Sequence, residues 1–215
     1  MKVKYLAHAS FLFTSAAGVK VIADPYAVGK DLTYGKVEEV ADVVLVSHDH
    51  GDHNDVRSIR GRPTVLKEHG AKTIKGITFT GIPTFHDDAE GRKRGNNLVF
   101  CFEMDGLRVC HLGDLGHVLN GGDTVAIGPV DILCVPVGGC YTIDAREATA
   151  VCASLSPKVV LPMHYKTAKC QYPITGVEDF LTGKTRIKRI EGGEIEFVAG
   201  SLPAGTDIVV LKPAL

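Results

Sequence analysis

The sequence lacks the features that mark several common classes of protein. Its 24 Lys and Arg against 25 Asp and Glu give a formal charge of −1, with no polybasic run. This argues against generic nucleic-acid binding, which depends on neutralising phosphates. No apolar run approaches the roughly 20 residues that span a bilayer, and residues 1–25 lack the unbroken apolar block of a secretory signal. We therefore expect a cytoplasmic protein without nucleic-acid or membrane partners.

The six cysteines do not form a recognisable framework. No CxxC pair occurs, although such pairs are typical of zinc ribbons and thiol oxidoreductases. Cys101, Cys110 and Cys134 lie within apolar runs, where a free cysteine behaves as a small hydrophobic residue. Disulfides are the alternative, but a reducing compartment favours buried thiols.

No linker, low-complexity segment or short-period repeat divides the chain, so we expect a single domain over residues 1–215. The run 43–46 (VVLV) has the continuous apolar character of a strand that is covered on both faces. The pair Asp105-Gly106 predicts a hairpin turn. The other predicted strands are residues 3–13, 19–23, 76–80, 98–103, 107–112, 131–137 and 158–162, with further strands in 186–211.

Helices are fewer than strands in this pattern. Residues 144–155 form the clearest one, because Asp144 can cap it and Glu147 can complete a capping box. Shorter helices are predicted over residues 53–60 and 176–182. Many strands with few helices indicate an α/β sandwich.

A dense polar cluster, His48-Asp49-His50-Gly51-Asp52-His53, directly follows the predicted strand 43–46. Three imidazoles and two carboxylates within six residues are poor core material and unusual for a solvated loop. Imidazole together with carboxylate suits Zn, Mn or Fe. Gly51 lets the backbone turn so that side chains on both sides of it converge. The alternative is a polar loop with incidental histidines.

Three more candidate ligands each lie just beyond a predicted strand, where loops at one edge of a sheet gather into a site. They are His86, Asp114 and His164, which follow the predicted strands 76–80, 107–112 and 158–162, respectively. Taken alone, each would be interpreted as structural. Beside the cluster 48–53, we interpret all three as metal ligands.

The order of these elements, beginning with Asp24 in Ile-Ala-Asp-Pro, resembles the metallo-β-lactamase superfamily. Within it, residues 113–117 (GDLGH), 136–139 (PVGG) and 162–165 (PMHY) are similar to a compact branch. That branch is akin to ascorbate-phosphate lactonase and the N-acyl-phosphatidylethanolamine phospholipase D. The resemblance implies a four-layer αββα sandwich, with two sheets packed face to face and helices outside.

The resemblance also implies a site for two divalent transition-metal ions, with zinc as the first expectation and manganese or iron as alternatives. The first ion would be held by His48, His50 and His86, the second by Asp52, His53 and His164, and both by a bridging Asp114. Asp24 would lie behind the ligands and hydrogen-bond their loop. The alternative for Asp24 is a strand-end turn before Pro25.

Two metals of this kind share a water and lower its pKa toward neutrality. The resulting hydroxide attacks a carbonyl carbon or a phosphorus, and the ions stabilise the oxyanion that develops. Asp52 is the candidate catalytic residue, which would steer the nucleophile or accept its proton. No Gly-x-Ser-x-Gly elbow is present. We therefore predict an enzyme, a dinuclear hydrolase of a small ester, lactone or phosphodiester.

For several other residues, the sequence allows more than one role. His8 is expected behind the ligand loop, with a satisfied core histidine as the alternative. His117, Tyr165 and Lys166 lie close to presumed ligands in the sequence and are candidates for binding substrate. Arg94 is a further candidate, because the basic loop 92–94 can receive a phosphate or carboxylate. A solvated hairpin is the alternative for this loop.

Several other functions compete with this prediction. A phosphodiesterase or nuclease acting on nucleic acid is disfavoured by the near-neutral charge. A di-iron protein that reduces oxygen or nitric oxide would need a flavin partner, and a β-lactamase proper would need export. From a different class, the chain could be a non-catalytic metal-binding sensor. The sequence specifies neither substrate nor oligomeric state, and a homo-oligomer is compatible with it.

Overall fold

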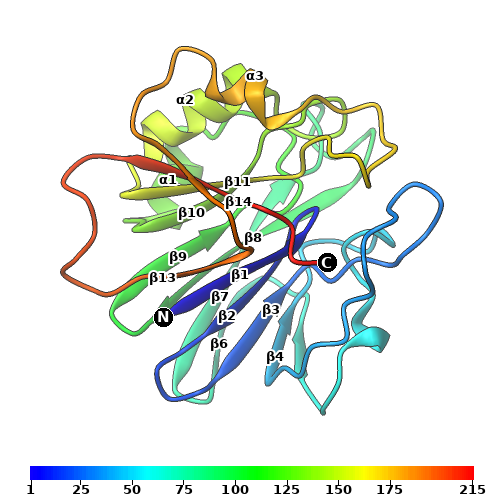
Figure 1. Ribbon diagram of the computed structural model, residues 1–215, viewed down its shortest axis with the longest axis vertical. Coiled ribbons are helices and arrows are strands. Elements are labelled where there is room, and N and C mark those ends of the chain that lie inside the picture. Colours follow the sequence, from blue (N-terminus) through cyan, green and yellow to red (C-terminus); the bar gives the residue numbers. More distant parts are fainter.

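The apolar runs of the sequence form two β-sheets packed face to face in the computed structural model, which describes all 215 residues (Figure 1). The six-stranded sheet has the order β13 (Glu194–Glu196), β1 (Lys2–Ala7), β2 (Ser10–Thr14), β3 (Lys20–Ala23), β4 (Val43–Leu45) and β5 (Thr64–Leu66). The eight-stranded sheet has the order β12 (Ile187–Ile190), β14 (Asp207–Leu211), β11 (Val159–Met163), β10 (Ile132–Pro136), β9 (Leu107–His111), β8 (Asn96–Met104), β7 (Ile77–Phe85) and β6 (Gly70–Ile74). The predicted two-sheet sandwich is confirmed.

The main core lies between the two sheets. Its aromatic side chains join one sheet to the other, since the ring of Phe13 on β2 lies edge-on to that of Phe102 on β8, with centroids 5.3 Å apart. Phe13 is fully buried, and burying a side chain of this size stabilises the fold by roughly 1.5–3 kcal/mol. This packing holds the two sheets against each other.

Two helices cover the outer face of the eight-stranded sheet. They are α2 (Ala145–Leu155) and α3 (Val177–Leu181), which pack against each other (Figure 1). The helix α2 begins as predicted: Asp144 accepts from the backbone N–H of Glu147, and the Glu147 side chain accepts from that of Asp144. The third helix, α1 (Gly121–Ile127), contacts β7 and was not predicted. None of the three has the length or apolar character needed to span a bilayer.

The hairpin between β8 and β9 also forms where it was predicted. Its two turn residues, Asp105 and Gly106, both have positive φ, at 53° and 73°. Two consecutive residues of this kind match the twist of the flanking strands. The turn brings Met104 opposite Leu107, so the buried faces of the two strands are in register.

A second, smaller core covers the outer face of the six-stranded sheet. Leu12, Ile22 and Val44 project from the sheet into it, against side chains from the irregular segment 24–41. The predicted helix over residues 53–60 lies beside this segment, and the prediction is wrong. Only a short 3₁₀ helix, η1 (Val56–Ser58), forms there. The backbone N–H groups at both ends of the predicted helix donate to this segment, Asp55 to Pro25 and Arg60 to Glu39. Hydrogen bonds to a neighbouring segment thus replace those of a helix.

Candidate metal centre

The candidate ligands meet at one end of the sandwich, because each lies just after a strand that ends there. The segment 48–53 follows β4 of the six-stranded sheet. His86, Asp114 and His164 follow β7, β9 and β11 of the eight-stranded sheet. The cluster is therefore assembled from both sheets, although its members are far apart in the sequence.

Asp114 lies at the centre of the cluster. Its Oδ2 atom is 3.2 Å from Nε2 of His53, 3.3 Å from that of His164, 3.4 Å from that of His86 and 4.0 Å from that of His48. All five side chains are at least 95% buried. One buried carboxylate thus faces four buried imidazoles.

The donor atoms fall into groups that could each hold an ion. Within each group, one atom per residue lies within 4.8 Å of the others. The three groups are His48, His50 and His86; His48, His53 and Asp114; and His8, Asp52, His53 and His164. The first group is the set expected for one metal, and the third contains the three residues expected for the other, together with His8.

The hydrogen bonding of these residues fits bound metal. His48 Nε2, His53 Nε2 and Asp114 Oδ1 are buried and have no hydrogen-bond partner. A buried polar atom left without a partner costs about 1–3 kcal/mol, and here such atoms are concentrated around one point. Burial, followed by the nearby His53, lowers the pKa of His48 to about 3. This imidazole is therefore neutral at pH 7, as a metal ligand must be.

Asp24 hydrogen-bonds the segment that carries the presumed ligands. Its Oδ1 accepts from the backbone N–H of Ser47 at 2.8 Å, and its Oδ2 accepts from the Ser47 hydroxyl at 2.7 Å. The same Oδ2 lies 3.0 Å from Nδ1 of His53. The Ser47 hydroxyl lies 2.8 Å from Nδ1 of His48. Although burial raises the pKa of Asp24, the hydrogen bond with His53 lowers it overall, so the carboxylate is ionised and accepts all these bonds.

His8 contacts the same cluster from the turn between β1 and β2. The sequence predicted one strand over residues 3–13, but the chain turns at His8, whose φ is 55°. The buried ring places Nε2 3.2 Å from Oδ2 of Asp52 and lies 4.1 Å from the ring of His164. Burial, then His164, lowers its pKa to about 4. The neutral ring therefore donates to Asp52 through Nε2.

A cavity of about 300 Å³ opens over the cluster. Arg94, a candidate for binding substrate, lines it beside the presumed ligands. Lys93 and Tyr141 also line it, as does Tyr172, which sequence analysis missed. Tyr172 lies in an irregular segment, and its ring comes within 5.8 Å of the His8 ring only through the fold of distant strands. No local pattern in the sequence marks it.

Tyr165 corrects a prediction. Its ring lies in the main core, 6.3 Å from that of Tyr5, and its hydroxyl donates to the carbonyl of Leu211. The preceding residue, His164, has a φ of 51°. The consecutive side chains of His164 and Tyr165 therefore point to different regions: His164 lies in the cluster, and Tyr165 lies in the main core.

Lys166 and His117 also lie outside the cavity over the cluster. The Lys166 ammonium donates to the carbonyl of Tyr172 at 2.6 Å. His117 accepts from the backbone N–H of Phe85 through Nε2 and donates to the carbonyl of Val118 through Nδ1. Both side chains thus hold loops around the site, and the structure does not place them as substrate ligands.

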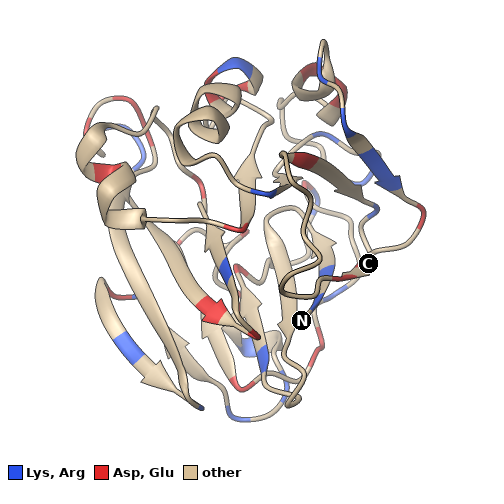
Figure 2. Ribbon diagram, turned by 90° about the vertical axis from the view of Figure 1, so that its left-hand side faces the viewer, with Lys and Arg blue, Asp and Glu red and all other residues tan.

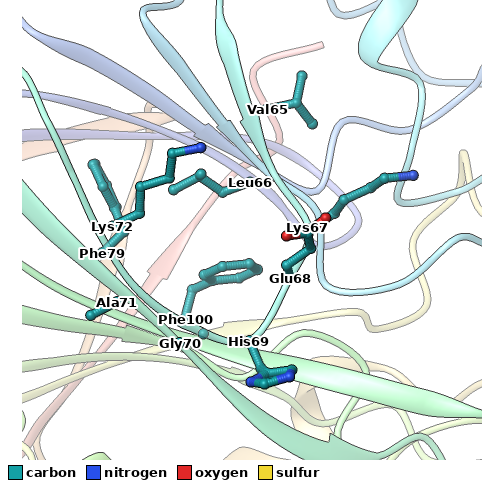
Figure 3. Close-up of a pocket in the computed structure, with 11 residues that line it drawn as sticks. Val65, Leu66, Lys67, Glu68, His69, Gly70, Ala71, Lys72, Phe79 and Phe100 are labelled. Atoms are coloured by element: carbon teal, nitrogen blue, oxygen red, sulfur yellow. The ribbon is translucent and has the colours of Figure 1, made fainter.

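A different cavity, also about 300 Å³, lies between the edges of the two sheets (Figure 3). Phe79 and Phe100 line it together with the segment 67–69. A Cβ atom at Gly81 would lie 2.6 Å from the carbonyl oxygen of Glu68, so this segment packs directly on β7. The cavity contains one histidine and no group of metal-binding side chains. The groups of potential metal donors lie at the other cavity.

Comparisons with known proteins agree with this geometry. The chain matches the family described as the beta-lactamase superfamily domain over residues 2–164. It is 32% identical over 196 residues to a UPF0173 metal-dependent hydrolase of Thermococcus kodakarensis, covering 78% of this chain and 85% of the relative. A second such hydrolase, from Pelotomaculum thermopropionicum, is 33% identical over 199 residues with the same coverage.

Solved structures show the same similarity. A protein of Thermotoga maritima, described as a Zn-dependent hydrolase of the metallo-beta-lactamase superfamily, is 37% identical. Its TM-score is 0.83, over 98% of this chain and 97% of that one. A hydrolase structure from Parabacteroides distasonis, 20% identical with a TM-score of 0.67 over 98% and 93% of the two chains, shares the fold. The chain belongs to the metallo-β-lactamase superfamily.

Proposed function

We propose that the protein is a dinuclear metal-dependent hydrolase that activates water for attack on a small ester, lactone or phosphodiester. One observation carries this proposal: the Asp114 carboxylate faces four imidazoles from two sheets, between two groups of donor atoms. A single structural ion would not need both groups. The names of the relatives support hydrolysis, because they are described as metal-dependent hydrolases.

The proposed ligands divide between two ions as the family resemblance implies. His48, His50 and His86 would hold one, Asp52, His53 and His164 the other, and Asp114 both. Imidazole and carboxylate ligands suit zinc first, with manganese or iron as alternatives. When bound, such ions lower the pKa of a shared water and polarise the group under attack.

The protein's own residues orient this chemistry. Asp52 lines the cavity, and the His8 hydrogen bond fixes one of its oxygens. Burial raises the pKa of Asp52, but the His8 hydrogen bond and the charge of His53 lower it below its usual value. The carboxylate is thus ionised near neutral pH, where it can orient an attacking water or accept its proton. No serine or cysteine nucleophile lines the cavity.

We further propose a small-molecule substrate rather than a nucleic acid. Lys and Arg are interspersed with Asp and Glu over the face in Figure 2, and the net charge is −1. A surface of this kind does not concentrate a polyanion. Residues 113–117 and 162–165 resemble the branch akin to a lactonase and a phospholipase D. This resemblance favours a lactone or a phosphodiester as the substrate.

Metal analysis combined with turnover tests the proposal. We expect the purified protein to bind two transition-metal ions per chain and to hydrolyse members of a panel of lactones, esters and phosphodiesters. His50→Ala should abolish turnover and reduce the metal content, whereas Val125→Ala, which alters an exposed side chain of α1 outside both cavities, should change neither. Two bound ions without turnover on the whole panel would favour a sensor. Failure to bind any transition metal would refute the proposal.

A further inference from the structure

Arg94 lies where two hollows of the surface meet. One is the cavity over the candidate ligands. The other is a groove of about 860 Å³, which runs from the loop 47–50 past residues 94–98 to the segment 67–69. His50 and Arg94 line both hollows. A molecule that extends from the metal site into the groove must therefore pass the Arg94 side chain.

The loop that carries Arg94 is built on the Asp87 carboxylate. Oδ1 of Asp87 accepts from the backbone N–H groups of Ala89 and Gly91, at 2.8 and 3.0 Å. Oδ2 accepts from those of Lys93 and Arg94, at 2.9 and 2.7 Å. Asp87 directly follows the presumed ligand His86, so the same segment positions both this histidine and the arginine.

The backbone at Asp87 is itself packed closely against Gly116. A Cβ atom at Gly116 would lie 2.2 Å from the backbone nitrogen of Asp87. Gly116 also donates its N–H to the carbonyl of Phe85. Packing and a hydrogen bond therefore hold the backbone from which the loop starts.

The guanidinium of Arg94 is the one free cation of this loop. Arg92 pairs with Glu90 at 3.3 Å, and the Lys93 ammonium pairs with Asp88 at 2.6 Å. Arg94 has no ion pair, and its guanidinium carbon lies 5.4 Å from the centroid of the Tyr141 ring, which also lines the cavity. Stacking on an aromatic ring leaves the N–H edge of a guanidinium available for a planar oxyanion.

We propose that Arg94 binds an anionic group of the substrate, a carboxylate or a phosphate, so that the enzyme selects anionic substrates over neutral ones. The proposal rests on the function proposed above and narrows its substrate class. The Tyr141 ring lies beneath the guanidinium carbon, and the loop built on Asp87 fixes the start of the side chain. A fork of two N–H donors then holds two oxygens of the anion while the scissile bond lies over the metal site.

Matched substrates test this selectivity. Para-nitrophenyl esters whose acyl chains end in a carboxylate or in a methyl group differ only in charge. We expect Arg94→Gln to lower the ratio of kcat/KM for the anionic over the neutral ester by about 10- to 100-fold, mainly through KM, because a charged hydrogen bond is lost. Arg94→Lys should restore part of the ratio. The matched control Arg92→Gln, in the same loop but paired with Glu90, should leave the ratio unchanged.

A binding measurement decides the question independently of turnover. Inorganic phosphate and acetate are titrated into the metal-loaded wild type, Arg94→Gln and Arg92→Gln, and the heat of binding is recorded. We expect affinity for at least one anion to fall about 10-fold in Arg94→Gln alone, and the anion with the larger loss identifies phosphate or carboxylate as the natural group. Equal affinity in all three proteins, or no binding of either anion to the wild type, would overturn the inference. Absence of metal would instead refute the proposed function.

Discussion

Oδ2 of Asp24 lies 3.0 Å from Nδ1 of His53 and so presents the opposite nitrogen of that ring to Asp114. The same carboxylate is linked to His48 through Ser47, because the Ser47 hydroxyl donates to Asp24 and lies 2.8 Å from Nδ1 of His48. One buried carboxylate thus sets the orientation of two imidazoles. Partners of this kind strengthen metal ligands by fixing their tautomer.

We therefore expect Asp24→Asn to lower metal affinity by about 10- to 100-fold. The amide can no longer accept from both Ser47 and the His53 ring, so neither imidazole is held in its metal-binding tautomer. Competition with a chromogenic chelator measures the affinity. Asp49→Asn is the matched control, since Asp49 lies in the same loop but is exposed, and it should leave the affinity unchanged. Equal affinity in the two variants would contradict the prediction.

His8 should affect the position of Asp52 more than the fold. His8→Phe keeps an aromatic ring against His164 but removes the donor to Asp52, so we expect kcat to fall about 10-fold with metal still bound. His8→Gln retains an N–H donor and should recover part of the activity. Steady-state kinetics with metal analysis of each variant make the comparison. A variant that loses all metal would show that His8 serves the ions directly.

Gly113 allows the close approach of β9 to the ligand loop. A Cβ atom there would lie 2.4 Å from Oδ1 of Asn97 and 2.5 Å from the Ser47 Cβ, and its φ is +56°. We expect Gly113→Ala to lower the free energy of unfolding by about 2–4 kcal/mol, from overpacking and backbone strain together. Gly29→Ala, where a Cβ meets nothing within 4 Å, should change it little. Urea unfolding of both variants provides the test.

Asp207 predicts a pH dependence of stability that is remote from the metal site. Hydrogen bonding to Lys188, at 2.7 Å, outweighs burial and, with Arg186, lowers the pKa of this carboxyl. Since the folded pKa lies below the unfolded value of about 3.9, the ion pairs stabilise the protein above that pH, and the contribution is lost as the pH falls through the folded pKa.

Asp207→Asn should therefore destabilise the protein at pH 7, and the difference from wild type should shrink as the pH falls below about 4. Chemical unfolding at a series of pH values measures that difference. Asp179→Asn, on the exposed side of α3, is the control and should show no such trend. A difference that is constant with pH would mean that packing, not charge, accounts for the effect.

Much of the fold and the arrangement of the cluster could be predicted because the signals are local. Alternating and continuous apolar runs mark strands, Asp105-Gly106 marks the hairpin, and Asp144 with Glu147 marks the start of α2. The candidate ligands could be identified because each follows a strand, and strand ends gather at an edge. These features depend on a few neighbouring residues.

Other features depend on contacts between distant segments and had no such signal. The segment 53–60 has helical character, but Pro25 and Glu39 offer its backbone other acceptors. Tyr165 was misassigned because the positive φ of His164 redirects the chain between two adjacent side chains. Tyr172 reaches the cavity only because a loop folds back over it. In each case the decisive partner lies far away in the sequence.

The division of the donor atoms between the two sheets has a consequence for the lifetime of the protein. His53 comes from one sheet and Asp114 from the other, so any separation of the sheets disperses the donors. An ion bound by donors from both sheets would therefore bind only the folded chain, and its binding free energy would add to the stability of that state. Loss of such an ion would remove this contribution, so we expect the metal-free protein to be cleaved by proteases faster than the metal-bound protein.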